Sequence, residues 1–210
     1  MKYIYSVLIA VAAFLLCSCK DEASPKLVMV TNATFPPYEY IDKGKIEGID
    51  PHIIRTVSER LGYQLEIQDM SFDSVIAAVQ SGKADIAASG ITVTAERKKQ
   101  VSFTVPYVVA KQVIIVPKNS KIKGSGDLLK AKIAVQHGTT GDTYVTKNIG
   151  DPERYSHGPL AVAALLAEKV DAVVVDSEPA EVYISQHASL HILPLPESGR
   201  LWGRGGSCGW

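Results

Sequence analysis

Two stretches of the sequence alternate strand-like and helix-like segments, and this alternation limits the chain to an α/β fold. The first unit predicts strands at 27–31, 63–68 and 85–89 and helices at 51–61 and 72–80. The second unit predicts strands at 132–136 and 170–176 and helices at 139–148, 159–169 and 178–186. Alternating elements of this kind form mostly parallel sheets with helices on their faces. We therefore predict two lobes, each a mostly parallel sheet flanked by helices.

The segment between the two units, residues 111–117, has the apolar core Val113-Ile114-Ile115-Val116 and predicts a strand that crosses from one lobe to the other. The predicted organisation is a first lobe at 27–110, a hinge strand at 111–117 and a second lobe at 118–193. Ligands of such sheets bind beyond the carboxyl ends of the strands. The cleft is therefore expected next to the residues that follow Thr31, Ser89, Gln136 and Val175.

The N-terminus predicts an export signal. Lys2 precedes an apolar run at 4–16, which is shorter than the ~20 residues of a transmembrane helix. Leu16-Cys17-Ser18-Cys19 resembles the lipobox of bacterial lipoproteins, which implies a signal peptide at 1–18 and a lipid on Cys19. An ordinary signal cut nearby, or a short anchor, is the alternative. Polar residues 19–26 then predict a tether between the membrane and the domain.

Composition narrows the classes of ligand. The chain has 22 basic and 22 acidic residues, whereas a surface that binds nucleic acid needs a basic excess. The five histidines are scattered, and no CxxC or HExxH pattern occurs, so neither a metal site nor a cofactor is expected. The balance of charges suits a nearly neutral ligand, but it does not specify which ligand.

Polar and aromatic residues cluster after the strands of the first lobe. The loop after Thr31 contains Phe35, which can offer a ring face to a ligand. The segment after Ser89 contains Gly90, whose small size lets a backbone approach, and the hydroxyl of Thr92. Arg97 lies in the first turn of a helix capped by Thr94, where it opposes the helix dipole. Its guanidinium suits a carboxylate, although a surface ion pair with Glu96 or another neighbour is the alternative.

The strand ends of the second lobe offer one site for an anion and one for a cation. Gln136-His137-Gly138-Thr139-Thr140-Gly141 joins a strand to a helix N-terminus, where amide groups and the helix dipole favour an anion. The P-loop ending GK[ST] is absent from it. Asp176 ends an apolar strand, a costly place for an acid unless it meets a cation or caps the next helix. A fixed cation site and a fixed anion site together predict a receptor for a zwitterion.

Several motifs occur in an order that resembles the bacterial family 3 solute-binding proteins, the polar amino acid receptors of ABC importers. The resemblance runs from about Leu27 to Leu195. Its motifs are Phe35-Pro36-Pro37-Tyr38, Gly48-Ile49-Asp50, Asp85-Ile86-Ala87, Gly90-Ile91-Thr92-Val93-Thr94-Ala95-Glu96-Arg97, Phe103-Thr104-Val105-Pro106-Tyr107, Gly138-Thr139-Thr140 and Asp171-Ala172-Val173-Val174-Val175-Asp176.

The resemblance implies a role for each candidate residue. Arg97 would bind the α-carboxylate of the ligand, helped by the hydroxyls of Thr92 and of Thr139 or Thr140. Asp176 would accept the α-ammonium, with Gly90 or Ser89 as a further partner. Phe35 and Phe72 would sandwich the ligand side chain, and Gln136 would contact its distal end. Binding would close the two lobes of a monomer for recognition by a permease, without catalytic residues.

The resemblance leaves the ligand and the activity partly open. The arginine and basic amino acid branch is favoured, but Asn32 stands where several such members carry an aspartate, and glutamine or histidine would also suit it. A cyclohexadienyl dehydratase-like enzyme, using Glu39 or Glu178, and an amino acid sensor module are the alternatives. Members of the family normally continue past residue 194 with a second hinge strand and helices that finish the first lobe. The resemblance therefore implies that 194–210, with both tryptophans and five of the sixteen glycines, is an aberrant tail.

Overall fold

A computed structural model describes residues 24–196 of the chain. The predicted signal peptide at 1–18, the lipidation site Cys19, residues 20–23 of the tether and residues 197–210 of the tail lie outside the described residues. Within the described range, none of the helices combines the length and apolarity that a bilayer-spanning helix requires.

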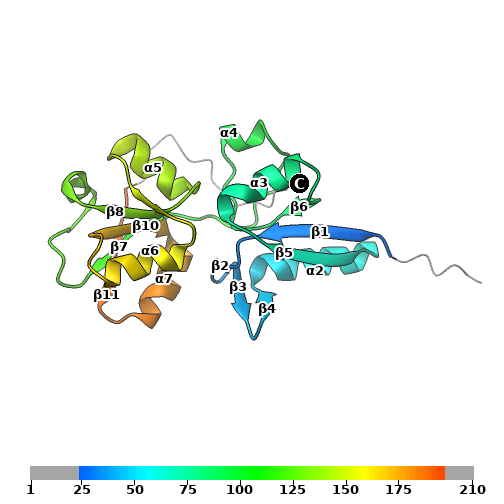
Figure 1. Cartoon of the computed structure of the whole chain (residues 1–210), viewed down its shortest axis with the longest axis horizontal. Coiled ribbons are helices and arrows are strands. Elements are labelled where there is room, and N and C mark those ends of the chain that lie inside the picture. Colours follow the sequence, from blue (N-terminus) through cyan, green and yellow to red (C-terminus); the bar gives the residue numbers. More distant parts are fainter. Residues whose placement is uncertain (1–23, 197–210) are drawn as a thin grey trace, which may run out of the picture.

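The first lobe is built on a three-stranded parallel sheet with the order β5-β1-β6 (Figure 1). Its strands are β1 (Lys26–Thr31), β5 (Gln64–Asp69) and β6 (Ile86–Ala87), and its helices are α2 (Ile49–Leu61), α3 (Phe72–Gln80) and the short α4 (Ala95–Lys98). Successive β1 residues serve opposite faces of the sheet, since Met29 packs with Ile54 of α2 and Val30 with Val75 of α3. Both faces of β1 are thus covered, which explains its unbroken apolar sequence.

A small antiparallel sheet, which the sequence did not predict, follows β1. It consists of β2 (Thr34–Phe35), β3 (Glu39–Asp42) and β4 (Lys45–Glu47). The two-residue turn Lys43-Gly44 has positive φ angles of 48° and 78°, as a tight hairpin requires. The hairpin extends from the region between the lobes, where β2 lies close to the second lobe (Figure 1).

The second lobe contains a five-stranded sheet with the order β11-β7-β10-β8-β9. Its strands are β7 (Gln112–Pro117), β8 (Ile133–Gln136), β9 (Glu153–Tyr155), β10 (Ala172–Asp176) and β11 (Leu190–Pro194). Its helices are α5 (Thr140–Asn148), α6 (Gly158–Leu166) and α7 (Ser177–Gln186), with a 3-10 helix at Ser125–Lys130. Ile115 and Val173 pack toward α6, whereas Ile114 and Val174 pack toward α5. The two α/β lobes that the alternation of elements predicts are confirmed.

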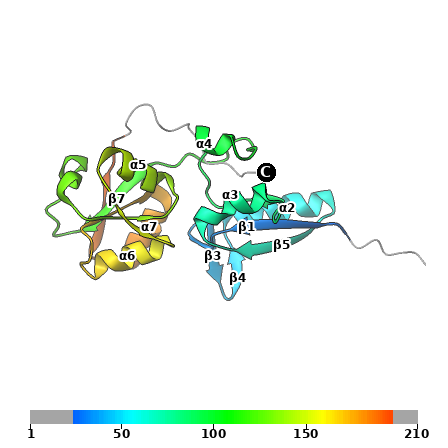
Figure 2. The same cartoon turned by 45° about the horizontal axis from the view of Figure 1, so that its top comes forward.

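The sheet of the second lobe is mixed. β8, β9 and β10 are parallel, but β7 runs antiparallel to both β10 and β11. The direction follows from the path of the chain, since β7 receives the segment that leaves the first lobe (Figure 2). It therefore begins at the edge where β10 ends, with Gln112 opposite Asp176. Residues 112–117 pair with strands of the second lobe, and their role as a hinge stays a prediction.

Candidate functional site

A pocket of about 430 Å³, part of it open to solvent, lies between the lobes at the carboxyl ends of β1, β6, β8 and β10. The sequence predicted its position from these four strand ends. Nine of the predicted site residues line it, namely Phe35, Phe72, Gly90, Thr92, Arg97, Gln136, Thr139, Thr140 and Asp176.

Arg97 brings a buried cation to the pocket from the first lobe. Thr94 caps α4 by accepting a hydrogen bond from the Arg97 amide at 3.1 Å, which places the side chain at the pocket. The guanidinium donates to the carbonyl of Thr92 at 2.8 Å and to the carbonyl of Gly138, in the second lobe, at 3.0 Å. Burial lowers the pKa of Arg97 to about 10, and the charge of Asp176 opposes that effect, so Arg97 stays charged at neutral pH.

The environment of Arg97 disagrees with the alternative of a surface ion pair. Arg97 is only 9% exposed, and its guanidinium lies 5.4 Å from the centroid of the Phe72 ring, within range of a cation–π contact. In the described part of the chain, none of the salt bridges involves Arg97 or Glu96. The buried guanidinium therefore retains donors that a carboxylate in the pocket could use.

Asp176 brings a carboxylate to the pocket from the second lobe. It occupies the N-cap position of α7, but its side chain makes no capping hydrogen bond and accepts one from Gln112 Nε2. Burial raises the pKa of Asp176 to about 7; the Gln112 hydrogen bond and Arg97 oppose this, whereas Glu178 adds to it. A cationic group placed next to this carboxylate would stabilise its charged form.

The predicted anion cradle at the start of α5 is partly occupied by the protein itself. The Gly138 amide donates to Asp142 Oδ2 at 3.0 Å, and Asp142 pairs with Arg154 at 3.0 Å. Thr139 is the N-cap, accepting from the Asp142 amide at 3.2 Å and donating to the Gln136 carbonyl at 2.8 Å. Thr140 Oγ1 accepts from Gln112 Nε2 at 3.1 Å. These groups shape the pocket wall more than they offer free donors.

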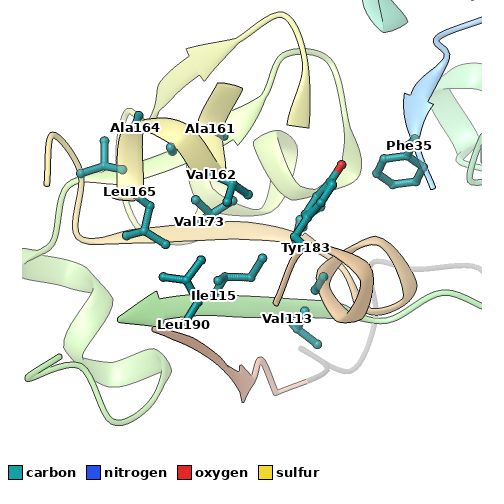
Figure 3. Packing of buried hydrophobic residues seen from close by; sticks show 14 of the residues in the cluster. Phe35, Val113, Ile115, Ala161, Val162, Ala164, Leu165, Val173, Tyr183 and Leu190 are labelled. Atoms are coloured by element: carbon teal, nitrogen blue, oxygen red, sulfur yellow. The ribbon is translucent and has the colours of Figure 1, made fainter. Parts of the chain in front are cut away.

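Phe35 joins the two lobes at the aromatic wall of the pocket. Its ring stacks on Tyr38 with centroids 6.0 Å apart, and both rings belong to the hydrophobic cluster of the second lobe. Figure 3 shows Phe35 beside Tyr183 of α7, whose hydroxyl donates to the Thr34 carbonyl at 3.1 Å. A Cβ on Gly90 would lie 3.2 Å from the Phe35 ring, so this glycine lets the ring reach the pocket.

Four other pocket residues were absent from the predicted site: Asn32, Gln112, Val174 and Val175. Asn32 follows Thr31 directly, and the strand-end rule pointed to it. Gln112 had no such signal, because it begins the strand predicted to cross between the lobes and does not follow a strand end. Val174 and Val175 read as ordinary strand residues.

Ser89 was predicted as a ligand partner but does not line the pocket. It is 1% exposed, and its hydroxyl accepts from the Asn32 amide and donates to Glu39 Oε1, both at 3.0 Å. The backbone turns at Gly90, which has a φ of +54°, and Gly90 lines the pocket in place of Ser89.

Direct contacts hold the lobes closed around the pocket. Asn32 Oδ1 accepts a hydrogen bond from Gln136 Nε2 at 2.9 Å, and the side-chain nitrogen Nδ2 of Asn32 lies 3.2 Å from His157 Nδ1. Asp73 of α3 lies 3.3 Å from His137 Nδ1, at the point where Gly138 approaches α3. In residues 24–196, no cluster of three or more His, Cys, Asp or Glu side chains is arranged to hold a metal ion.

Comparison with known proteins gives a consistent set of relatives. Residues 27–174 match the bacterial extracellular solute-binding proteins, family 3. A probable histidine-binding protein of Neisseria gonorrhoeae is 33% identical, with 94% of this chain and 80% of that protein covered. The arginine-binding extracellular protein ArtP of Bacillus subtilis is 30% identical, with 94% and 81% covered. The solved structure of a Gly52Ala mutant of arginine-bound ArgBP from T. maritima has a TM-score of 0.81 and 36% identity, with 88% of this chain and 86% of that chain covered.

Proposed function

The chain belongs to the bacterial extracellular solute-binding proteins, family 3, and on this basis we propose that it captures a polar L-amino acid for an ABC importer, with arginine favoured. The observation that carries the proposal is the pair of buried groups of opposite charge, Arg97 from one lobe and Asp176 from the other, at a single pocket. The common part of every amino acid ligand is a zwitterion. Arg97 would bind the α-carboxylate and Asp176 the α-ammonium.

Capture would proceed by closure of the lobes. A ligand that contacts Arg97 and Asp176 at once makes its full set of contacts only when the lobes are together, so it shifts the population toward the closed form. The permease would then recognise that form. This role requires no covalent chemistry, and we propose that the chain is not an enzyme.

The wall around the ligand side chain is aromatic and neutral. Phe35 and Phe72 offer ring faces on which a flat guanidinium can stack. At the polar end, the amide groups of Asn32 and Gln136 are hydrogen-bonded to each other. Such a wall would accept arginine, histidine or glutamine, and the histidine- and arginine-binding relatives agree with this range.

Titration calorimetry with arginine, lysine, histidine and glutamine tests the proposal. We expect a heat of binding from at least arginine, and Arg97→Ala should abolish it. Arg55→Ala is the matched control, because Arg55 pairs with Glu47 at 2.7 Å outside the pocket lining. No heat from any of these amino acids would contradict the receptor, and turnover of prephenate or arogenate would favour the dehydratase.

The family description agrees with export of the protein. We propose in addition that the protein is a monomer and is anchored by a lipid on Cys19. Mass spectrometry of the N-terminus tests the anchor, and an unlipidated N-terminus downstream of Cys19 would contradict it.

A further inference from the structure

A chain of buried polar groups lies behind the first-lobe wall of the pocket. Asp50 and Glu39 are 0% exposed and Ser89 is 1% exposed. They come from the first turn of α2, the start of β3 and the loop after β6. None of the three lines the pocket, so ligand binding as described above leaves them without a role.

Asp50 accepts hydrogen bonds on both carboxylate oxygens. The Gly90 amide donates to Oδ2 at 2.8 Å, and the Tyr107 hydroxyl donates to Oδ1 at 2.6 Å. An ionised carboxylate accepts on both oxygens, whereas a protonated one must use one oxygen as a donor. The contacts of Asp50 are therefore those of the ionised form.

Glu39 has the contacts of a neutral acid. Its Oε1 accepts from the Ser89 hydroxyl at 3.0 Å, while no donor of the described residues faces its buried Oε2. The neighbouring Asp50 carboxyl raises the pKa of Glu39, and Glu39 in turn lowers the pKa of Asp50. Since both oxygens of Asp50 already accept, a proton held by this pair of carboxyl groups belongs on Glu39.

This buried chain fixes two pocket residues by their backbones. The Asn32 amide donates to Ser89, and the Gly90 amide donates to Asp50, so both amides point away from the pocket. The position of Gly90 in turn affects the Phe35 ring, because the ring packs closely against Gly90, where a Cβ would lie only 3.2 Å from it.

We propose that Asp50 is a positioning residue for ligand binding: its ionised carboxylate holds the Gly90 backbone and thereby the Phe35 ring at the pocket. Glu39 is the neutral partner, and its proton allows the two carboxyl groups to lie together. Burial and the charge of Asp50 raise the pKa of Glu39 well above its usual range, in agreement with this assignment. Burial also raises the pKa of Asp50, but hydrogen bonds from Tyr107, Gly90 and Glu39 oppose it. Among the described residues, Asp176 and Tyr183 also interact electrostatically with Glu39.

Three variants of the full chain test this division of roles. Glu39→Gln keeps an acceptor for Ser89 and a donor for Asp50, so it should bind arginine within about threefold of the wild type, whereas Glu39→Ala should lose that affinity. Asp50→Asn can accept on only one oxygen, so its affinity should fall about tenfold or more. Tolerance of Asp50→Asn together with loss of binding in Glu39→Gln would overturn the assignment.

Infrared spectroscopy tests the proton directly and without a ligand. At about pH 8, where Asp176 is mostly ionised, the wild type should show the carbonyl stretch of a protonated buried carboxyl group, and Glu39→Gln should lack it. Absence of the band from the wild type, or its persistence in Glu39→Gln, would overturn the proposal even if Asp50→Asn does not fold. The affinity arm rests on the proposed function. If the wild type binds no amino acid, the receptor is refuted, while the infrared result still decides where the proton lies.

Discussion

Replacement of Asp176 by asparagine should change stability and ligand binding in opposite directions. Asp176 is buried at the end of β10, and its pKa is raised from 3.8 to about 7. The unfolded chain ionises this carboxyl at a lower pH than the folded protein does. The free energy of unfolding that depends on Asp176 is therefore full below pH 3.8 and is lost as the pH rises through 7.

The size of the effect follows from that pKa difference. Well above pH 7, burial of the charged carboxylate costs roughly 4 kcal/mol, of which about 2 kcal/mol is already present at pH 5.5. Asparagine has nearly the shape of the neutral acid and keeps an acceptor for Gln112. In the absence of ligand, the variant should therefore unfold at higher denaturant concentration than the wild type, by a margin that widens by about 2 kcal/mol between pH 5.5 and pH 8.

Urea unfolding at the two pH values, with and without arginine, measures both effects. Arginine at 100 times its dissociation constant should raise the free energy of unfolding of the wild type by about 2.7 kcal/mol and leave Asp176→Asn nearly unchanged. The wild type and the variant share every other titrating group, so their difference isolates Asp176. A ligand-free variant that is less stable than the wild type at pH 8 would refute the reasoning.

Three further substitutions probe the pocket. Gly138→Ala places a Cβ 3.2 Å from that of Asp73 in α3, so it should hinder closure and weaken arginine binding about tenfold, measured by calorimetry. Its control is Gly62→Ala, which has the same φ of +75° but no neighbour within 4 Å, and which should lose stability without losing affinity. Gly90→Ala crowds the pocket wall at φ +54° and should reduce affinity several-fold, and its positive φ should also lower the free energy of unfolding by about 1–2 kcal/mol, measured by urea unfolding. Gln112→Ala removes a hydrogen bond that lowers the pKa of Asp176, so the pH midpoint of arginine affinity should move upward; an unchanged midpoint would contradict this role.

The sequence predicted the sheets well where a strand is covered on both faces. β1 and β10 are continuous apolar runs because helices pack on each side of them. The hairpin β2–β4 was missed because its strands are short and the prolines at 36 and 37 argue against regular structure. β11 was missed because its alternation is weak.

The sequence predicted most of the pocket lining but missed Gln112, and each outcome has a physical reason. The rule that ligands bind beyond strand ends located Gly90, Gln136 and Asp176, because parallel strands carry their carboxyl ends to one edge. Gln112 enters the pocket from the amino end of an antiparallel strand, a direction set by how the chain passes between the lobes. No local pattern encodes that direction.

The packing of Phe35 and Tyr38 against the second lobe has a calorimetric consequence. Both rings are nearly covered by the hydrophobic cluster of that lobe, at 9% and 2% exposure, although they belong to the first lobe. Separation of the lobes would hydrate this apolar surface, and closure would dehydrate it again. The heat capacity change on binding should therefore be negative and larger than burial of a small charged ligand alone produces, because much of it comes from the protein's own aromatic surface.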